Sequence, residues 1–295
     1  MKKYYSFAGV QLKIRCPDEF AYTEERRLEP FAVPGCPPQA ERFTFSFVEE
    51  LPAPCGALLC TEPAFRVYEA AGAGQTLQAY DRYVGVVHED PTAGYMVVQT
   101  RGREHAVLLR RGAFSGRIGT HTVLNALWAE HLALRADGVV LHASYIEWQG
   151  RAILFTAPSG TGKSTQADLW EKYRGARLVN GDRAVLRRDE ASPTGFVACG
   201  LPFSGSSKVC RNVTLPVAAI AYLGQAPYTT LQPLRGAQAF RALWEGCSLA
   251  AWHREDLALA SGLISEAVGR VPVCRLDCTP DETAVTALNN WLEEV

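Results

Sequence analysis

The segment APSGTGKS at residues 157–164 decides how this chain should fold. It has the spacing of a phosphate-binding loop, G-x-x-x-x-G-K-[ST], with alanine in place of the first glycine. Gly160 and Gly162 allow the backbone to wrap a phosphate without side-chain clashes. Successive N–H groups then point at the phosphate, beside the positive end of the following helix. The segment therefore predicts a nucleotide site.

The residues around this loop agree with that interpretation. The apolar run 153–155 predicts a buried strand before the loop, and residues 163 to about 173 predict a helix after it. A first strand over 139–146 and a second over 152–156 are expected to form a hairpin, with Gln149-Gly150 as the turn. Strand, loop and helix thus follow one another in the order that phosphate binding requires.

The polar residues of the loop have separate expected roles. Lys163 should reach the β- and γ-phosphates of ATP, and the Ser164 hydroxyl should ligate Mg²⁺. Asp182 follows the apolar pair Leu178-Val179, so it is expected at a strand tip opposite the loop, where it would hold Mg²⁺ or take a proton. The residues expected to contact the nucleotide are Ser159, Gly160, Thr161, Gly162, Lys163, Ser164 and Thr165.

Composition excludes several classes of protein. The 295 residues contain 30 Lys and Arg against 31 Asp and Glu, without a basic block, which argues against nucleic acid as the main partner. No apolar stretch is long enough to cross a bilayer, and Gln11 and Lys13 interrupt the apolar run of a secretory signal. Nine cysteines, an odd number, form no disulfide framework. A cytoplasmic protein without a membrane partner is expected.

The chain is expected to have a β-rich N-terminal domain over residues 1–118. Prolines between Pro30 and Pro63 favour long loops or sheet edges there. Short alternating runs separated by Gly or Pro predict an antiparallel sheet of hairpins. These runs are 43–48, 82–88, 95–100 and 106–110.

The second domain is expected over residues 119–295, with a mixed α/β (α+β) composition. A helix is predicted over 120–135, with Thr120 or Thr122 as its N-cap. Further strands are predicted at 184–186 and 217–223, and further helices at 236–245, 255–268 and 281–292.

Two flanking segments give the phosphate loop a family resemblance. Leu141-His142-Ala143 precedes it and Leu178-Val179-Asn180-Gly181-Asp182-Arg183 follows it. Together the three segments resemble the core of HPr kinase/phosphorylase, over roughly residues 142–225. That wider group includes serine kinases that modify ribosomally made peptides, and it shares a nucleotide core with ATP-dependent phosphoenolpyruvate carboxykinases. The resemblance implies a nucleotide domain of this type that follows the β-rich domain in the sequence, with ATP and Mg²⁺ as ligands.

The resemblance also assigns roles to individual residues. It places His142 near the transferred phosphate. Asp182 matches the second of two adjacent aspartates, and Gly181 stands where the first would be. The missing aspartate leaves Asp182 or His142 to act as the base. In the loop after residue 200, Lys208 and Arg211 are expected to clamp phosphate.

Two classes of function follow. The first is a kinase that transfers the γ-phosphate of ATP to a hydroxyl, on a serine of a peptide or small protein or on a small alcohol. The second is an ATP-binding switch without phosphotransfer, which the loss of the aspartate at Gly181 supports. Carboxykinase chemistry would need metal-ligating residues that the sequence does not offer. The β-rich domain is expected to recognise the acceptor or to form a homo-oligomer contact.

The remaining histidines are expected to be structural, because their positions along the chain show no metal-binding spacing. They are His88, His105, His121, His131 and His253.

Overall fold

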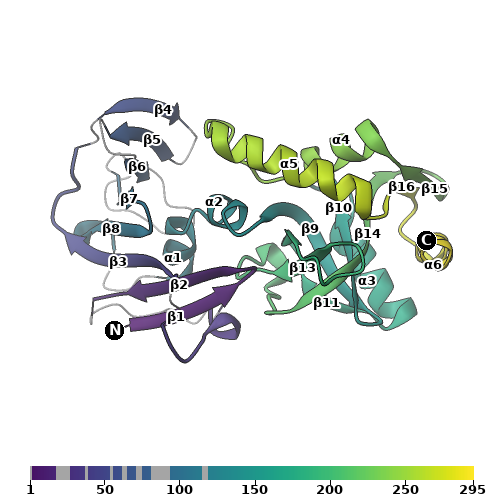
Figure 1. Cartoon of the computed structure of the whole chain (residues 1–295). Coiled ribbons are helices and arrows are strands. Elements are labelled where there is room, and N and C mark those ends of the chain that lie inside the picture. The colour runs from purple at the N-terminus through teal and green to yellow at the C-terminus, as the bar shows by residue number, and fades with distance from the viewer. Residues whose placement is uncertain are drawn as a thin grey trace. The chain divides into compact units, whose positions relative to one another are not determined.

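The protein is described by a computed structural model, which covers residues 2–17, 27–36, 39–53, 56–61, 65–70, 75–80, 94–114 and 119–295 (Figure 1). The chain divides into two compact units. The first extends to Leu127, apart from residues 7–9, and the second comprises these three residues and Trp128–Val295. The strand predicted over 82–88 lies outside the described residues.

The first unit contains a sheet of eight strands in the order β1-β2-β3-β8-β7-β6-β5-β4. The prediction of a wholly antiparallel sheet is wrong at β3, which is parallel to both β2 and β8. Parallel neighbours need a crossover instead of a tight turn, so local hairpin signals could not reveal them. The strands are β1 Lys2–Phe7, β2 Val10–Arg15, β3 Glu41–Val48, β4 Ala57–Thr61, β5 Phe65–Ala70, β6 Gln75–Tyr80, β7 Met96–Arg101 and β8 Glu104–Arg110.

The second unit is built on another eight-stranded sheet, of mixed parallel and antiparallel strands. Its order is β10-β9-β12-β13-β14-β16-β15, and β11 pairs with β9. β10 is antiparallel to β9 and parallel to β14, so the path through β9, β12, β13 and β14 returns to β10. The strands are β9 Gly138–Trp148, β10 Arg151–Thr156, β11 Arg177–Asn180, β12 Arg183–Arg188, β13 Phe196–Gly200, β14 Thr214–Gln225, β15 Thr230–Leu234 and β16 Val273–Cys278.

Helices cover both faces of this sheet. α3 (Lys163–Arg174) and α6 (Glu282–Glu294) pack on one face, and α4 (Gly236–Gly246) and α5 (Arg254–Arg270) on the other (Figure 1). Along β10 the side chains alternate, since Ile153 and Phe155 contact the first helix layer and Leu154 contacts the second. This two-sided burial explains why the strand reads as continuously apolar.

The helix predicted over 120–135 is instead two short helices, α1 (Thr120–Ala126) and α2 (Ala129–Leu134). Trp128 between them has a φ of +45°, a left-handed conformation that ends a helix. Neither predicted threonine caps α1, because its N-cap is Gly119, without a side-chain hydrogen bond. The division between the two units falls at this break, later than the boundary predicted at residue 118. The strands and helices predicted from residue 139 onward are confirmed within a few residues at their ends.

Within the described ranges, no helix combines the length and the apolar character that a membrane span requires.

Candidate active site

Strand β9 aligns the two halves of the candidate site. Its first half pairs with β12, where His142 lies opposite Arg183. Its second half pairs with β10, where Ala143 lies opposite Thr156, the last residue before the loop. The hairpin turn at Gln149 and Gly150 has φ of +51° and +72°, as a tight two-residue turn requires. His142 is therefore fixed beside the start of the phosphate loop.

The phosphate loop has the backbone that its sequence predicts. Gly160 and Gly162 have φ of +80° and +114°, and a Cβ at either position would meet open space. Both glycines are therefore required by backbone conformation rather than by packing. The residues on each side, Ser159 and Ser164, are exposed, and α3 begins directly at Lys163. The loop thus presents the N-terminus of a twelve-residue helix to solvent.

The Lys163 side chain lies folded into the loop. The residue is 7% exposed, and its Nζ donates to the carbonyl oxygens of Ala157 at 2.9 Å and Pro158 at 3.1 Å. Burial lowers the pKa of the Lys163 ammonium, and the Asp182 carboxylate opposes that shift. The ammonium and the carboxylate therefore interact across the site.

A cavity of about 290 Å³ opens beside the loop. It lies at the carboxyl ends of β10, β14 and β16, which run parallel to one another. This edge of a parallel sheet is where α/β proteins commonly bind ligands. The lining includes Gly160, Thr165, Gln166, Gln225, Cys278 and Thr279.

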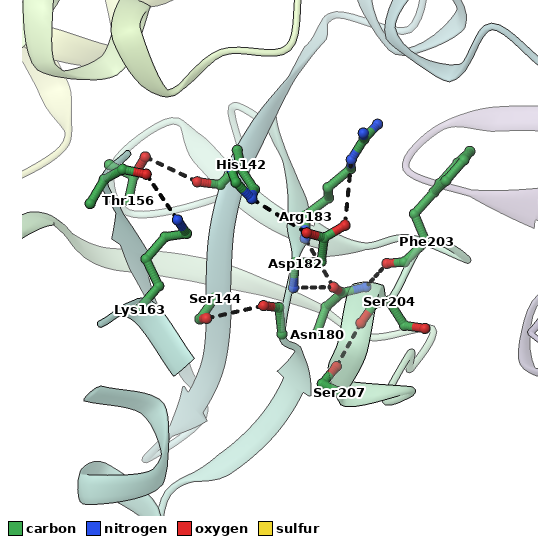
Figure 2. A network of polar contacts seen from close by, with 12 residues as sticks. His142, Ser144, Thr156, Lys163, Asn180, Asp182, Arg183, Phe203, Ser204 and Ser207 are labelled. Carbon is green, nitrogen blue, oxygen red and sulfur yellow. Dashed lines mark hydrogen bonds and ion pairs between the residues drawn. The ribbon is translucent and has the colours of Figure 1, made fainter. Parts of the chain in front are cut away.

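His142 and Asp182 face each other across the site. His142 Nε2 lies 3.4 Å from Asp182 Oδ1, and both side chains are partly exposed (Figure 2). Burial and the Lys163 charge lower the pKa of the His142 imidazole, with Asp182 acting in the opposite direction. The lowered pKa favours the unprotonated imidazole, the form that can accept a proton. The structure brings together His142, Lys163 and Asp182, the three predicted catalytic residues.

Asn180 holds the turn that carries Asp182. Its Oδ1 accepts from the backbone N–H groups of Asp182 at 2.9 Å and Arg183 at 3.0 Å. Its Nδ2 donates to the carbonyl oxygens of Leu201 at 2.9 Å and Phe203 at 2.6 Å (Figure 2). The side chain is fully buried, so these bonds fix the turn to the segment that follows β13.

Sequence reasoning treated Asn180 only as part of a motif. A polar residue directly after the apolar pair Leu178-Val179 was the available signal, because an asparagine buried at a strand end needs several hydrogen-bond partners.

The segment after β13 packs directly against the Asp182 side chain. A Cβ on Gly205 would lie 2.9 Å from both Cβ and Cγ of Asp182, and Gly205 has a φ of +51°. Arg183 Nε lies 3.6 Å from Asp182 Oδ2, and its Nη1 donates to Glu130 at 2.8 Å. The Asp182 carboxylate is therefore held by a close backbone and a guanidinium.

The two predicted phosphate clamps lie in different settings. Arg211 Nε donates to the Leu178 carbonyl at 3.0 Å, and its backbone N–H donates to Val179 at 3.1 Å. Part of the Arg211 guanidinium thus attaches its segment to β11. Lys208 is exposed, with a left-handed φ of +55°. Phosphate binding by Lys208 and Arg211 stays a prediction.

Comparison with protein-family models finds no match to this chain, and comparison with curated proteins finds none either.

Proposed function

We propose that this chain is an ATP- and Mg²⁺-dependent kinase of the HPr kinase/phosphorylase type, which transfers the γ-phosphate to a hydroxyl. One observation carries the proposal: the phosphate loop begins beside β9, whose His142 faces Asp182 at 3.4 Å. Phosphate binding and proton acceptance are the two tasks that phosphoryl transfer to a hydroxyl requires.

The loop side of the site suits a nucleoside triphosphate. Free backbone N–H groups at the start of α3 attract phosphate oxygens, and the Lys163 ammonium adds a positive charge. The bonds from Lys163 to the Ala157 and Pro158 carbonyls are ones that a triphosphate would replace. The neighbouring cavity at the ends of β14 and β16 offers room for the nucleoside.

The opposite side of the site suits a hydroxyl acceptor. Asp182 would orient the hydroxyl or take its proton, and the unprotonated His142 beside it offers a second acceptor. A serine on a peptide or small protein is the acceptor that the family resemblance favours. The exposed Lys208 would then contact the acceptor or its phosphate.

The residues present fit Mg²⁺. Ser164 at the start of α3 and the partly exposed Asp182 both provide oxygen ligands, which this cation prefers. Bound there, Mg²⁺ would neutralise phosphate charge during transfer. Ser164 and Asp182 are thus the proposed ligands.

The test compares ADP release and ATP binding in wild type and Asp182→Asn, with serine peptides and small alcohols as acceptors. We expect acceptor-dependent ADP release in wild type and its loss in Asp182→Asn, with ATP affinity changed by less than about threefold. Asp168→Asn is the matched control, because Asp168 is an exposed aspartate on α3. Tight ATP binding without turnover for any acceptor would instead support an ATP-binding switch.

A further inference from the structure

We infer that His131, His253 and Asp256 form a binding site for a divalent transition metal of the Zn²⁺ class, separate from the phosphate loop. All three residues belong to the second unit. Their potential ligand atoms lie within 4.8 Å of one another.

Two helices bring these residues together. His131 lies on α2, whereas His253 is the N-cap of α5 and Asp256 lies in the first turn of the same helix. The spacing of three residues between His253 and Asp256 places both side chains on one side of the helix. The sequence could not indicate this site, because His131 is distant from the other two along the chain.

One carboxylate oxygen lies between the two imidazoles. Asp256 Oδ1 is 2.9 Å from His131 Nδ1 and 3.0 Å from His253 Nδ1. Two ligands of one tetrahedral Zn²⁺ ion, each with a bond of about 2.0–2.2 Å, are separated by roughly 3.3–3.6 Å. The observed separations are shorter than this range, so the side chains would have to move outward to admit the ion.

The close approach of the His253 ring nitrogen to a buried carboxylate suits a cation here. His253 Nδ1 accepts the backbone N–H of Asp256 at 3.2 Å, which favours the form with a lone pair on that nitrogen. The same nitrogen faces the Asp256 carboxylate at 3.0 Å. This nitrogen has a single lone pair, so a metal ion bound to it would replace the backbone hydrogen bond. The Asp256 side chain is 2% exposed, which increases the cost of leaving its charge uncompensated.

Aromatic residues fix the ligands in place. Trp128 stacks on the His131 ring at 4.2 Å and on Trp252 at 4.9 Å. Trp128 has a φ of +45°, a strained conformation for a bulky residue, and such strain is concentrated at functional sites. The stacked Trp128 and Trp252 rings limit water around Asp256. The side chains of His131 and His253 are 16% and 22% exposed, which leaves a path for the ion.

The ligand set selects the class of metal. Two imidazoles and one carboxylate suit Zn²⁺ and the neighbouring transition metals, whereas Mg²⁺ prefers oxygen ligands alone. Three protein ligands leave a fourth position for water. The metal would tie α2 to the start of α5. It would also steady Glu130, whose carboxylate bonds Arg183 beside Asp182.

The experiment uses untagged, chelator-treated protein without nucleotide, titrated with Co²⁺ as a spectroscopic probe and then with Zn²⁺ in competition. We expect visible Co²⁺ absorption that saturates at one equivalent and that Zn²⁺ removes. His131→Gln and His253→Gln should each weaken binding at least tenfold. His142→Gln is the matched control, because it removes the other histidine–carboxylate pair of this unit and should leave Co²⁺ affinity unchanged.

A measurement on wild type makes the result independent of variant folding. The imidazole ¹⁵N resonances of His131 and His253 should shift together on addition of one equivalent of Zn²⁺. Unchanged resonances and absent Co²⁺ absorption would show that the cluster holds a shared proton only, and would overturn the proposal. Binding that His142→Gln abolishes and His131→Gln does not would overturn it as well.

Discussion

Gly181 faces Ser207 so closely that a Cβ on Gly181 would lie 2.6 Å from both the Cβ and the Oγ of Ser207. Any side chain at this position would displace the segment that packs on Asp182, so the contact requires a glycine here. Ser207 is itself held, because its Oγ donates to the Ser204 carbonyl at 2.7 Å.

We expect Gly181→Ala to lower the free energy of unfolding by about 1–3 kcal/mol, because the added methyl group overlaps Ser207. Ser207→Gly removes both overlapping atoms, so the double variant should recover most of that loss. Urea unfolding of wild type, both single variants and the double variant measures the effect. If Gly181→Ala lowered the free energy of unfolding equally in wild type and in Ser207→Gly, the close contact would be contradicted.

Asn180→Ala should lower the free energy of unfolding by at least about 2 kcal/mol, because it leaves buried backbone groups at Asp182, Arg183, Leu201 and Phe203 without their partner. Asn289→Ala, at a surface position on α6, should change stability by less than about 0.5 kcal/mol. Chemical denaturation measures both. ATP affinity of folded Asn180→Ala should stay near wild type, since the phosphate loop is not attached to this side chain.

The pKa of His142 should respond in opposite directions to two variants. Burial is the main cause of its low value, Lys163 adds to the lowering and Asp182 opposes it. Lys163→Met should therefore raise the pKa of His142, and Asp182→Asn should lower it further. NMR titration of the imidazole measures both shifts. Shifts of the same sign would show that the three side chains do not share one electrostatic environment.

The same depressed pKa has a consequence for stability. The unfolded chain binds this proton near the ordinary pKa of 6.5, whereas folded His142 binds it only at lower pH. Stability should therefore fall as the pH decreases from 6.5 through the lower, folded-state pKa. In His142→Gln this contribution to the pH dependence should vanish, which unfolding experiments across that pH range would detect.

Lys163→Met should weaken ATP binding by about tenfold or more, because it removes the cation beside the phosphate-binding backbone. Lys172→Met is the matched control, since Lys172 is an exposed lysine in the last turn of the same helix. Isothermal titration with ATP measures both affinities. Equal affinities would argue against phosphate binding at the loop.

The fold around the phosphate loop was predictable because its signals are local. Glycines at 160 and 162 are required by backbone angles that few other residues adopt, and the turn at Gln149-Gly150 is similarly encoded. Strand, loop and helix followed from these positions. The resemblance placed His142 near the transferred phosphate and the apolar pair Leu178-Val179 placed Asp182 opposite the loop, but neither predicted the contact between the two side chains.

Other features depend on contacts between distant segments. Trp128 interrupts a segment with helical periodicity, because its left-handed conformation is supported by stacking on Trp252, far along the chain. The parallel pairing of β3 with β8 spans four intervening strands, so no local pattern encodes it. The cluster around Asp256 was missed for the same reason.

Strand β9 also limits how this molecule can vary over evolution. β9 pairs with β12 through one half and with β10 through the other. The number of residues in the strand therefore sets how His142 is aligned with the phosphate loop. One residue added between His142 and Ala143 would place the side chains of one half of the strand on the opposite face of the sheet, so the imidazole and the loop would no longer be aligned. Insertions beyond Trp148 or after Gly200 leave that alignment intact. The loops can therefore vary in length, while the strand tolerates substitution and not insertion.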